Sequence, residues 1–116
     1  MSSPLSPMIE ATQFIKTGQT HQKIATALYK NSDDTIIILF SISGQLKHTK
    51  TVSLTYIQSL GSPMSFVSKI TDTLIKNFIK NGKNFGEAVY QTSNHHGLND
   101  TPYYILSSMQ LRNLIQ

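Results

Sequence analysis

The chain of 116 residues contains no cysteine and no tryptophan, and its only arginine is Arg112. Without cysteine, the chain can form no disulfide, no thiol nucleophile and no cysteine–zinc site, which is compatible with a reducing compartment. Arginine is the favoured side chain for recognising phosphate and guanine, so a mild basic excess with a single arginine is only weak support for nucleic-acid binding. The composition therefore excludes several chemistries before any motif is considered.

Charge is also scarce. Only 14% of the residues are charged, and 10 basic against 6 acidic residues give a net charge of +4. The polar surface must therefore be built largely from Ser, Thr, Asn and Gln, and the mild basic excess permits an anionic partner without requiring one. Richness in Ile, Lys, Asn, Ser and Thr is typical of a bacterial or phage genome of low GC content.

Long hydrophobic runs are missing. The longest uninterrupted apolar run, Ile36 to Phe40, is far too short to span a membrane. The N-terminal residues carry neither an early positive charge nor the apolar segment of a signal peptide. We therefore expect no membrane span and a soluble, cytoplasmic protein, although delivery by a secretion system that reads another signal remains compatible with the sequence.

The clearest pattern lies between Ser62 and Gly82 and predicts an amphipathic helix. Ser62 is suited to cap the first turn, Pro63 to occupy the first helical position, and Gly82 to end the helix. At about 100° per residue, the apolar side chains cover an arc of roughly 220°. They are Phe66, Val67, Ile70, Leu74, Ile75, Phe78 and Ile79. Such an arc is wider than one sheet face needs, which predicts further cover from the C-terminus or from another subunit.

The opposite side of this helix is basic. Lys69, Lys76 and Lys80 fall within an arc of roughly 40°, and Lys83 extends the same side just past the end of the helix. The simpler interpretation is the solvated face of a core helix. The sharper interpretation is a contact stripe for phosphates or for an acidic partner. These four lysines are the candidate binding residues.

Around the helix, the chain predicts strands joined by tight turns. Residues 1–8 read as a disordered tail and residues 9–116 as one domain. Residues 9–16 fit a strand or a turn of helix, and residues 21–30 fit a strand better than a helix because polar turns follow them. Residues 35–42 form a buried central strand, and residues 47–57 alternate as a further strand.

The C-terminal third predicts smaller elements. We expect short strands at 87–91 and 103–106, separated by a polar loop at 93–102. Ser107, with Gln110 three residues later, forms a capping box for a last helix. That helix presents Leu111, Leu114 and Ile115 on one side. The predicted fold is α+β, with a three- to five-stranded antiparallel meander packed by one long amphipathic helix, plus a short C-terminal helix.

Reactive side chains gather only in the predicted loop, where His95, His96 and Asp100 are metal-ligand types. Adjacent histidines rarely face one ion, and no third histidine follows at helical spacing. No glycine-rich phosphate loop or nucleophile elbow occurs either. We therefore predict no metal, no cofactor and no catalytic residue. Five tyrosines fit the rims of the core better than base stacking, namely Tyr29, Tyr56, Tyr90, Tyr103 and Tyr104.

These observations favour a non-catalytic protein-interaction module, not an enzyme. It would be an accessory subunit or adaptor of a bacterial or phage system, with a protein partner or self-association through the wide apolar arc. The alternative is a nucleic-acid-binding accessory protein that uses the basic face of helix 62–82.

Overall fold

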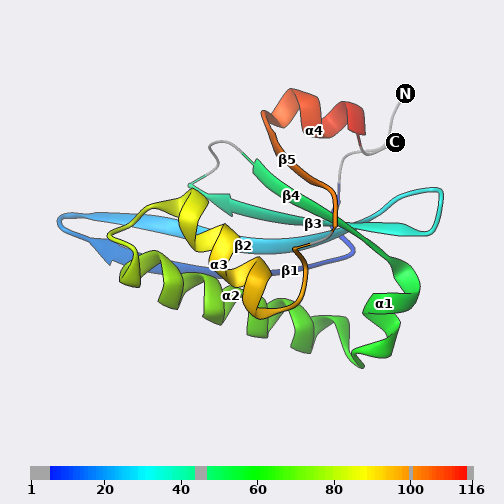
Figure 1. Cartoon of the computed structure of the whole chain (residues 1–116). Coiled ribbons are helices and arrows are strands. Elements are labelled where there is room, and N and C mark those ends of the chain that lie inside the picture. The colour runs from blue at the N-terminus through cyan, green and yellow to red at the C-terminus, as the bar shows by residue number, and fades with distance from the viewer. Residues whose placement is uncertain (1–5, 44–46, 100, 115–116) are drawn as a thin grey trace.

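In the computed structural model, which describes residues 6–43, 47–99 and 101–114, the chain forms a five-stranded antiparallel sheet. The strands lie in chain order and comprise β1 (Ile9–Thr17), β2 (Thr20–Lys30), β3 (Thr35–Ile42), β4 (Lys47–Ser53) and β5 (Tyr103–Leu106). The helices are α1 (Leu54–Ser59), α2 (Pro63–Lys80), α3 (Phe85–His95) and α4 (Ser108–Leu114). Helices α1 to α3 lie on one side of the sheet and α4 on the other (Figure 1). The predicted α+β meander is confirmed.

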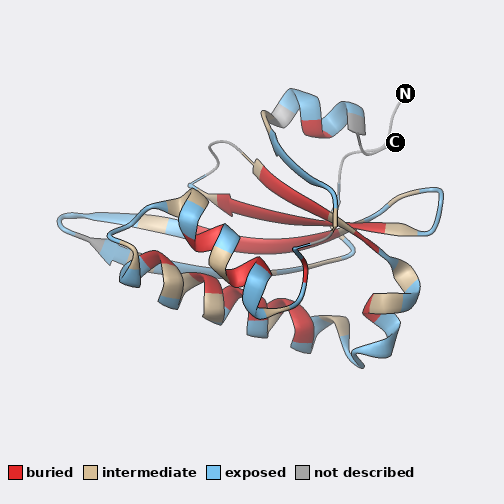
Figure 2. Cartoon of the chain, viewed as in Figure 1, coloured by how far each residue is buried: buried red, intermediate tan, exposed pale blue. Residues whose placement is uncertain are grey.

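The main core lies between the sheet and helices α2 and α3. Alternate residues of β2 and β3, among them Leu28, Ile38 and Phe40, are fully buried and point toward the helices. From α2, the side chains Phe66, Val67, Ile70, Leu74 and Phe78 complete this core. The buried sides of both helices face the sheet, and their other sides are exposed (Figure 2).

Helix α2 begins and ends as its sequence predicts. The Ser62 hydroxyl accepts a hydrogen bond from the Ser65 N–H at 3.4 Å, and Gly82 adopts a left-handed φ of 64° just past the helix. Helix α2 packs on β1 and β2, and α3 beside it covers part of the remaining apolar arc, whereas the C-terminal helix lies on the other face of the sheet (Figure 1). No helix in residues 6–43, 47–99 and 101–114 is long and apolar enough to cross a membrane.

The second face of the sheet carries a smaller apolar cluster under α4. Leu111 packs there against Ala27, Ile37 and Leu39. The predicted capping box is confirmed, because the Ser107 N–H donates to Gln110 Oε1 at 2.9 Å and the Gln110 N–H donates to Ser107 Oγ at 3.2 Å. The predicted contributions of the Leu114 side chain and of Ile115 lie outside the described residues.

The N-terminal segments are strands, which decides the alternative left open for residues 9–16 and confirms the strand at 21–30. Residues 1–5 of the predicted tail lie outside the described residues. Met8, at its end, already donates its N–H to the Leu28 carbonyl at 2.6 Å.

The predicted strand at 47–57 is wrong beyond Ser53, where the chain turns into α1. The Ser53 hydroxyl accepts the Tyr56 N–H at 3.0 Å and so caps a helix. The Leu54 N–H donates to the Asp34 carbonyl at 3.0 Å, which fixes the exit from the sheet. This turn carries Ile57 into the main core, where it is fully buried.

The predicted strand at 87–91 is also wrong, because these residues lie within α3. Asn84 Oδ1 accepts the Glu87 N–H at 3.0 Å and caps this helix. The buried side chains recur at helical spacing and are Ala88, Val89, Thr92 and Ser93. Residues 93–95, predicted as loop, are the last turn of α3, so the loop is shorter than predicted.

Candidate functional site

The solvent side of the α2–α3 contact is held together by amide side chains. Asn77 Nδ2 donates to Thr92 Oγ1 at 3.0 Å. Asn81 and Gln91 exchange two amide hydrogen bonds, at 3.1 and 3.2 Å. Because reciprocal amide bonds fix both donors and acceptors, the two helices are held at one spacing along this seam.

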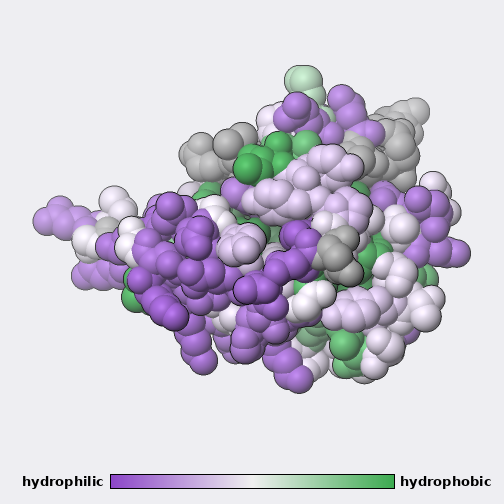
Figure 3. Space-filling view, in the orientation of Figure 1, coloured by the Kyte–Doolittle hydropathy of each residue, from purple (hydrophilic) through white to green (hydrophobic). Residues whose placement is uncertain are grey.

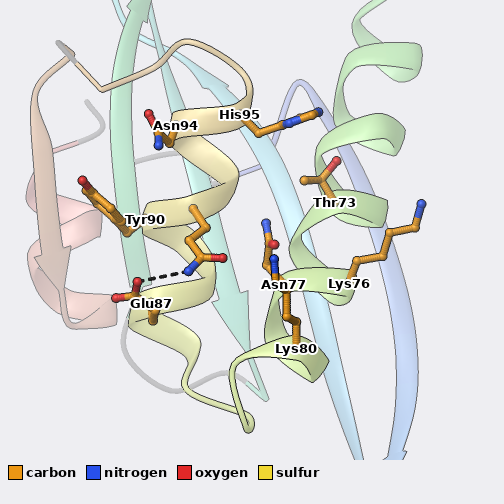
Figure 4. A pocket seen from close by; sticks show the side chains of 9 residues that line it. Thr73, Lys76, Asn77, Lys80, Glu87, Tyr90, Asn94 and His95 are labelled. Carbon is orange, nitrogen blue, oxygen red and sulfur yellow. Dashed lines mark hydrogen bonds between the residues drawn. The ribbon is translucent and has the colours of Figure 1, made fainter.

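Above this seam runs an open polar groove of about 740 Å³. Lys76 and Lys80 of α2 form one wall, while Asn94 and His95 of α3 contribute to the other (Figure 4). The remaining lining side chains are Thr73, Asn77, Glu87, Tyr90 and Gln91. The surface over these helices is strongly hydrophilic (Figure 3). The groove is therefore lined by polar and charged side chains, with two lysines on the α2 wall.

The structure brings together only part of the predicted lysine set. Lys76 and Lys80 line the groove, whereas Lys69 lines a separate hollow of about 220 Å³ with Tyr56 and His96. Lys83 lies past the end of α2 with a φ of 68°, exposed, and it lines neither hollow. The four residues thus form an interrupted stripe along one side of α2.

The two histidines of the predicted loop occupy the end of α3. His96 Nε2 lies 3.1 Å from Thr73 Oγ1, and the His96 carbonyl accepts the Tyr56 hydroxyl at 3.3 Å. Burial, with the nearby His95 and Lys69, lowers the pKa of the His96 imidazole. His96 therefore joins α1, α2 and α3. No three His, Asp or Glu side chains gather as metal ligands within the described part of the chain.

A second histidine anchors the last strand. The ring of His48 on β4 packs edge-on against Phe85 at 5.2 Å, and its Nδ1 contacts the Tyr103 hydroxyl. Lys50 Nζ lies 4.9 Å from the centre of the Tyr103 ring. Burial lowers the pKa of His48 and raises the pKa of Tyr103. The start of β5 is thus fixed to β4 and to α3.

Strand β5 forms one edge of the sheet, because its only strand neighbour in the described sheet is β4. Its side chains remain accessible, with Tyr103, Tyr104 and Ile105 exposed at 40%, 49% and 52%. Tyr90 of α3 is also exposed and points toward this strand (Figure 4). An uncharged strand with exposed aromatic and aliphatic side chains is typical of a protein interface.

Strand β1 forms the other edge and is longer. Phe14 is 69% exposed on this strand. Gln13 donates from Nε2 to Asp72 Oδ1 of α2 at 2.7 Å, so this side of α2 stands over the edge. The same helix carries Ile79 and Met64, exposed at 62% and 46%. Ile79 is the member of the wide apolar arc that the described residues leave most exposed, and Met64 adds a second exposed apolar side chain to the helix.

Comparisons with protein-family models, with curated proteins and with solved structures find no match to this chain. Sequence reasoning found the lysine stripe but missed both sheet edges. The uncharged run Tyr103–Leu106 and the excess width of the α2 arc were the available signals. Neither pattern indicates which strands lie at the two edges of the sheet.

Proposed function

We propose that this chain is a non-catalytic protein-interaction module of a bacterial or phage system, acting in the cytoplasm. It binds an extended apolar segment of a partner protein along β5. The observation that carries the proposal is the exposure of Tyr103, Tyr104 and Ile105 on a strand that has one free side.

Strand addition explains how such an edge would bind. The free backbone N–H and C=O groups of an edge strand pair with an incoming strand, and the side chains on its two faces select the sequence. Tyr103 and Ile105 point to the side of α3, where Tyr90 extends the contact surface. Tyr104 points to the side of α4. The partner therefore presents apolar residues on both faces of its strand.

The contacts that hold β5 in place are suited to this role. The contact of Tyr103 with His48 and its packing against Lys50 hold the strand in place before a partner arrives. A preformed edge spares the partner part of the entropy that ordering the strand would cost. Binding would therefore need few residues on the partner side.

The test is selection from a displayed library of random linear peptides on the immobilised full chain. We expect enrichment of short apolar sequences with micromolar dissociation constants. Their addition should slow hydrogen exchange and shift the NMR resonances of residues 103–106. Ile105→Lys should weaken binding at least tenfold, because it places an unpaired charge in the contact.

The matched control is Ile79→Lys, which changes the same residue type at similar exposure on another surface. This variant should bind the selected peptides as the wild-type chain does. Failure to enrich any peptide, or equal binding by the two lysine variants, would rule out β5 as the docking strand.

A second candidate function rests on the lysine stripe of α2. Lys76 and Lys80 line the 740 Å³ groove, and Lys69 lines the separate hollow of about 220 Å³. All three side chains are exposed. A row of exposed ammonium groups beside amide side chains is suited to a phosphate backbone. In this proposal the protein is an accessory factor that binds nucleic acid without reading its sequence.

Fluorescence anisotropy with labelled single- and double-stranded DNA and RNA tests this candidate. Binding should weaken from about 50 to 200 mM salt, with a log–log slope near one per phosphate contact. The triple variant Lys69/Lys76/Lys80→Glu should abolish it, whereas Lys16→Glu, a charge change on β1, should not. Absence of binding at the lowest salt would leave the lysines as a solvated face.

A further inference from the structure

We infer that a second copy of this chain pairs with the first along β1, so that two five-stranded sheets become one continuous ten-stranded sheet. This inference goes beyond the partner site on β5, because it concerns the opposite edge of the sheet. It rests on the charge pattern of β1, on the uncovered side of α2, and on the spacing that the pairing would give to the two α2 helices.

The charges of β1 are self-complementary in an antiparallel pair centred on Gln13. Glu10 and Lys16 lie three residues before and after Gln13, so each Glu10 faces Lys16 of the other copy. Both side chains lie on the α4 face of the strand, since alternate residues share a face. The pairing forms two symmetric ion pairs and brings no like charges opposite each other.

The other opposed residues of this register are also compatible. Between the centre and the ion pairs, the pairing sets Ala11 opposite Ile15 and Thr12 opposite Phe14. The first pair lies on the helix side and extends the apolar layer beneath α2, because both residues already pack against the main core. The second covers Phe14, which is 69% exposed in one copy. Centring the pair one residue earlier or later would keep the helices on the same face but would set Glu10 opposite Phe14 or Gly18 instead of Lys16.

Helix α2 supplies a second layer to the same contact. Ile79 follows Asp72 by seven residues and so lies about 20° from it around the helix, on the side held to β1 by Gln13. Ile75 and Met64 continue this side toward the core. In the paired sheet, the row of Met64, Ile75 and Ile79 on one α2 faces the same row on the α2 of the other copy.

The spacing of the elements allows this contact. Helix α2 packs on both β1 and β2, so its axis stands over the gap between them. With strands about 4.8 Å apart, the two α2 axes would be separated by about 10 Å, near the distance at which helices pack. Lys76, about 40° around the helix from Asp72, places a cation beside the two Asp72 carboxylates that approach the axis.

Sedimentation of the full chain tests the dimer and charge reversal tests its register. The wild-type chain should sediment at twice 13.0 kDa at micromolar concentration. Glu10→Lys and Lys16→Glu should each raise the dimer dissociation constant about tenfold or more, because each single change sets two like-charged pairs in contact. The double variant Glu10→Lys/Lys16→Glu should restore the wild-type value.

A cysteine placed on the axis gives an independent measurement, since the chain has no cysteine of its own. In Gln13→Cys, the two Cα atoms would lie about 4.5–5.5 Å apart, within the range that a disulfide bridges. We expect a covalent dimer on mild oxidation. Glu10→Cys is the control on the same strand, because its two copies would lie about 20 Å apart.

A wild-type chain that stays monomeric at high micromolar concentration would overturn the inference. A dimer whose dissociation constant is unchanged by the two single charge reversals would also overturn it. So would a dimer in which Glu10→Cys forms a disulfide as readily as Gln13→Cys. Peptide binding at β5 is measured separately on the same samples. A result that overturns one proposal therefore does not overturn the other.

Discussion

His48 is a residue whose protonation should control stability. It is buried beneath α3 and β5, where its ring packs against Phe85 and Tyr103, and burial lowers its pKa. The unfolded chain then binds the proton more readily than the folded chain. The free energy of unfolding should therefore be fully retained above about pH 6.5 and should fall as the pH drops toward the lowered pKa.

Urea unfolding at pH 7.5 and 5.0 measures this effect. The wild-type chain should lose stability at the lower pH, and His48→Gln should lose less, because it has no imidazole to protonate. His21→Gln, which changes an exposed histidine, should lose as much as the wild-type chain. An identical pH dependence in wild type and His48→Gln would contradict the assignment.

Thr26, in the centre of β2, carries a buried hydroxyl group without a hydrogen-bond partner among the described residues. The whole side chain is fully buried. Thr26→Val removes the buried hydroxyl while keeping the shape, and it should raise the free energy of unfolding by about 1 kcal/mol. Calorimetry would register this as an increase in Tm.

Thr49 is the matched control, because it is equally buried but donates from Oγ1 to the Tyr104 carbonyl at 3.4 Å. Thr49→Val should give no such gain, since it leaves that carbonyl with one partner fewer. If Thr26→Val destabilises as Thr49→Val does, the Thr26 hydroxyl is hydrogen-bonded in solution.

Helix α3 should depend strongly on its Asn84 cap. Its buried side chains are small or polar, so apolar burial contributes little to holding it on α2. Asn84→Ala should lower the free energy of unfolding by about 1 kcal/mol, because it removes the acceptor of the Glu87 N–H. Asn84→Asp keeps an acceptor and should match the wild type in urea unfolding. Equal losses in both variants would assign the effect to something other than the cap.

The sequence predicted those elements whose signals are local. Ser62 and Pro63 mark the start of α2, and the turn at Asn31–Asp34 separates two strands that are present in the structure. The α1 segment was misread because Val52, Leu54 and Tyr56 alternate as in a strand, and only the Ser53 cap distinguishes the helix. The α3 segment was misread because buried Thr92 and Ser93 give no apolar periodicity. Asn84 followed by Glu87 was the local signal available there.

The candidate surfaces were less accessible to prediction than the fold. The lysine stripe follows from helical spacing alone, so Lys69, Lys76 and Lys80 could be placed on one side of α2. The groove beside them needs α3 as its second wall, which the sequence did not predict. The exposure of Tyr104 and Phe14 depends on β5 and β1 being the edges of the sheet, and that is a property of the whole arrangement.

At the scale of the molecule, α4 is the one helix on the second face of the sheet in the described part of the chain (Figure 1). Leu111 is its buried contact with Ile37 and Leu39. Leu111→Ala should lower the free energy of unfolding by about 2–3 kcal/mol and increase binding of an apolar dye, because the small cluster opens to water.

Met109→Ala is the control within the same helix, since its side chain is exposed. It should change stability by less than about 0.5 kcal/mol. A Leu111→Ala variant as stable as Met109→Ala would show that α4 contributes little to holding the second face together.

The order of elements along the chain also determines when the sheet can be completed. Strands β1 to β4 pair with their immediate neighbours in sequence, so each step closes only a short loop. The pairing of Lys50 with Tyr103 instead spans the three helices between β4 and β5. During synthesis the first four strands can pair before the last strand exists, and we expect β5 to join the sheet last. A nascent chain would then present β4 as its temporary edge until the exposed tyrosines of β5 are added to the sheet.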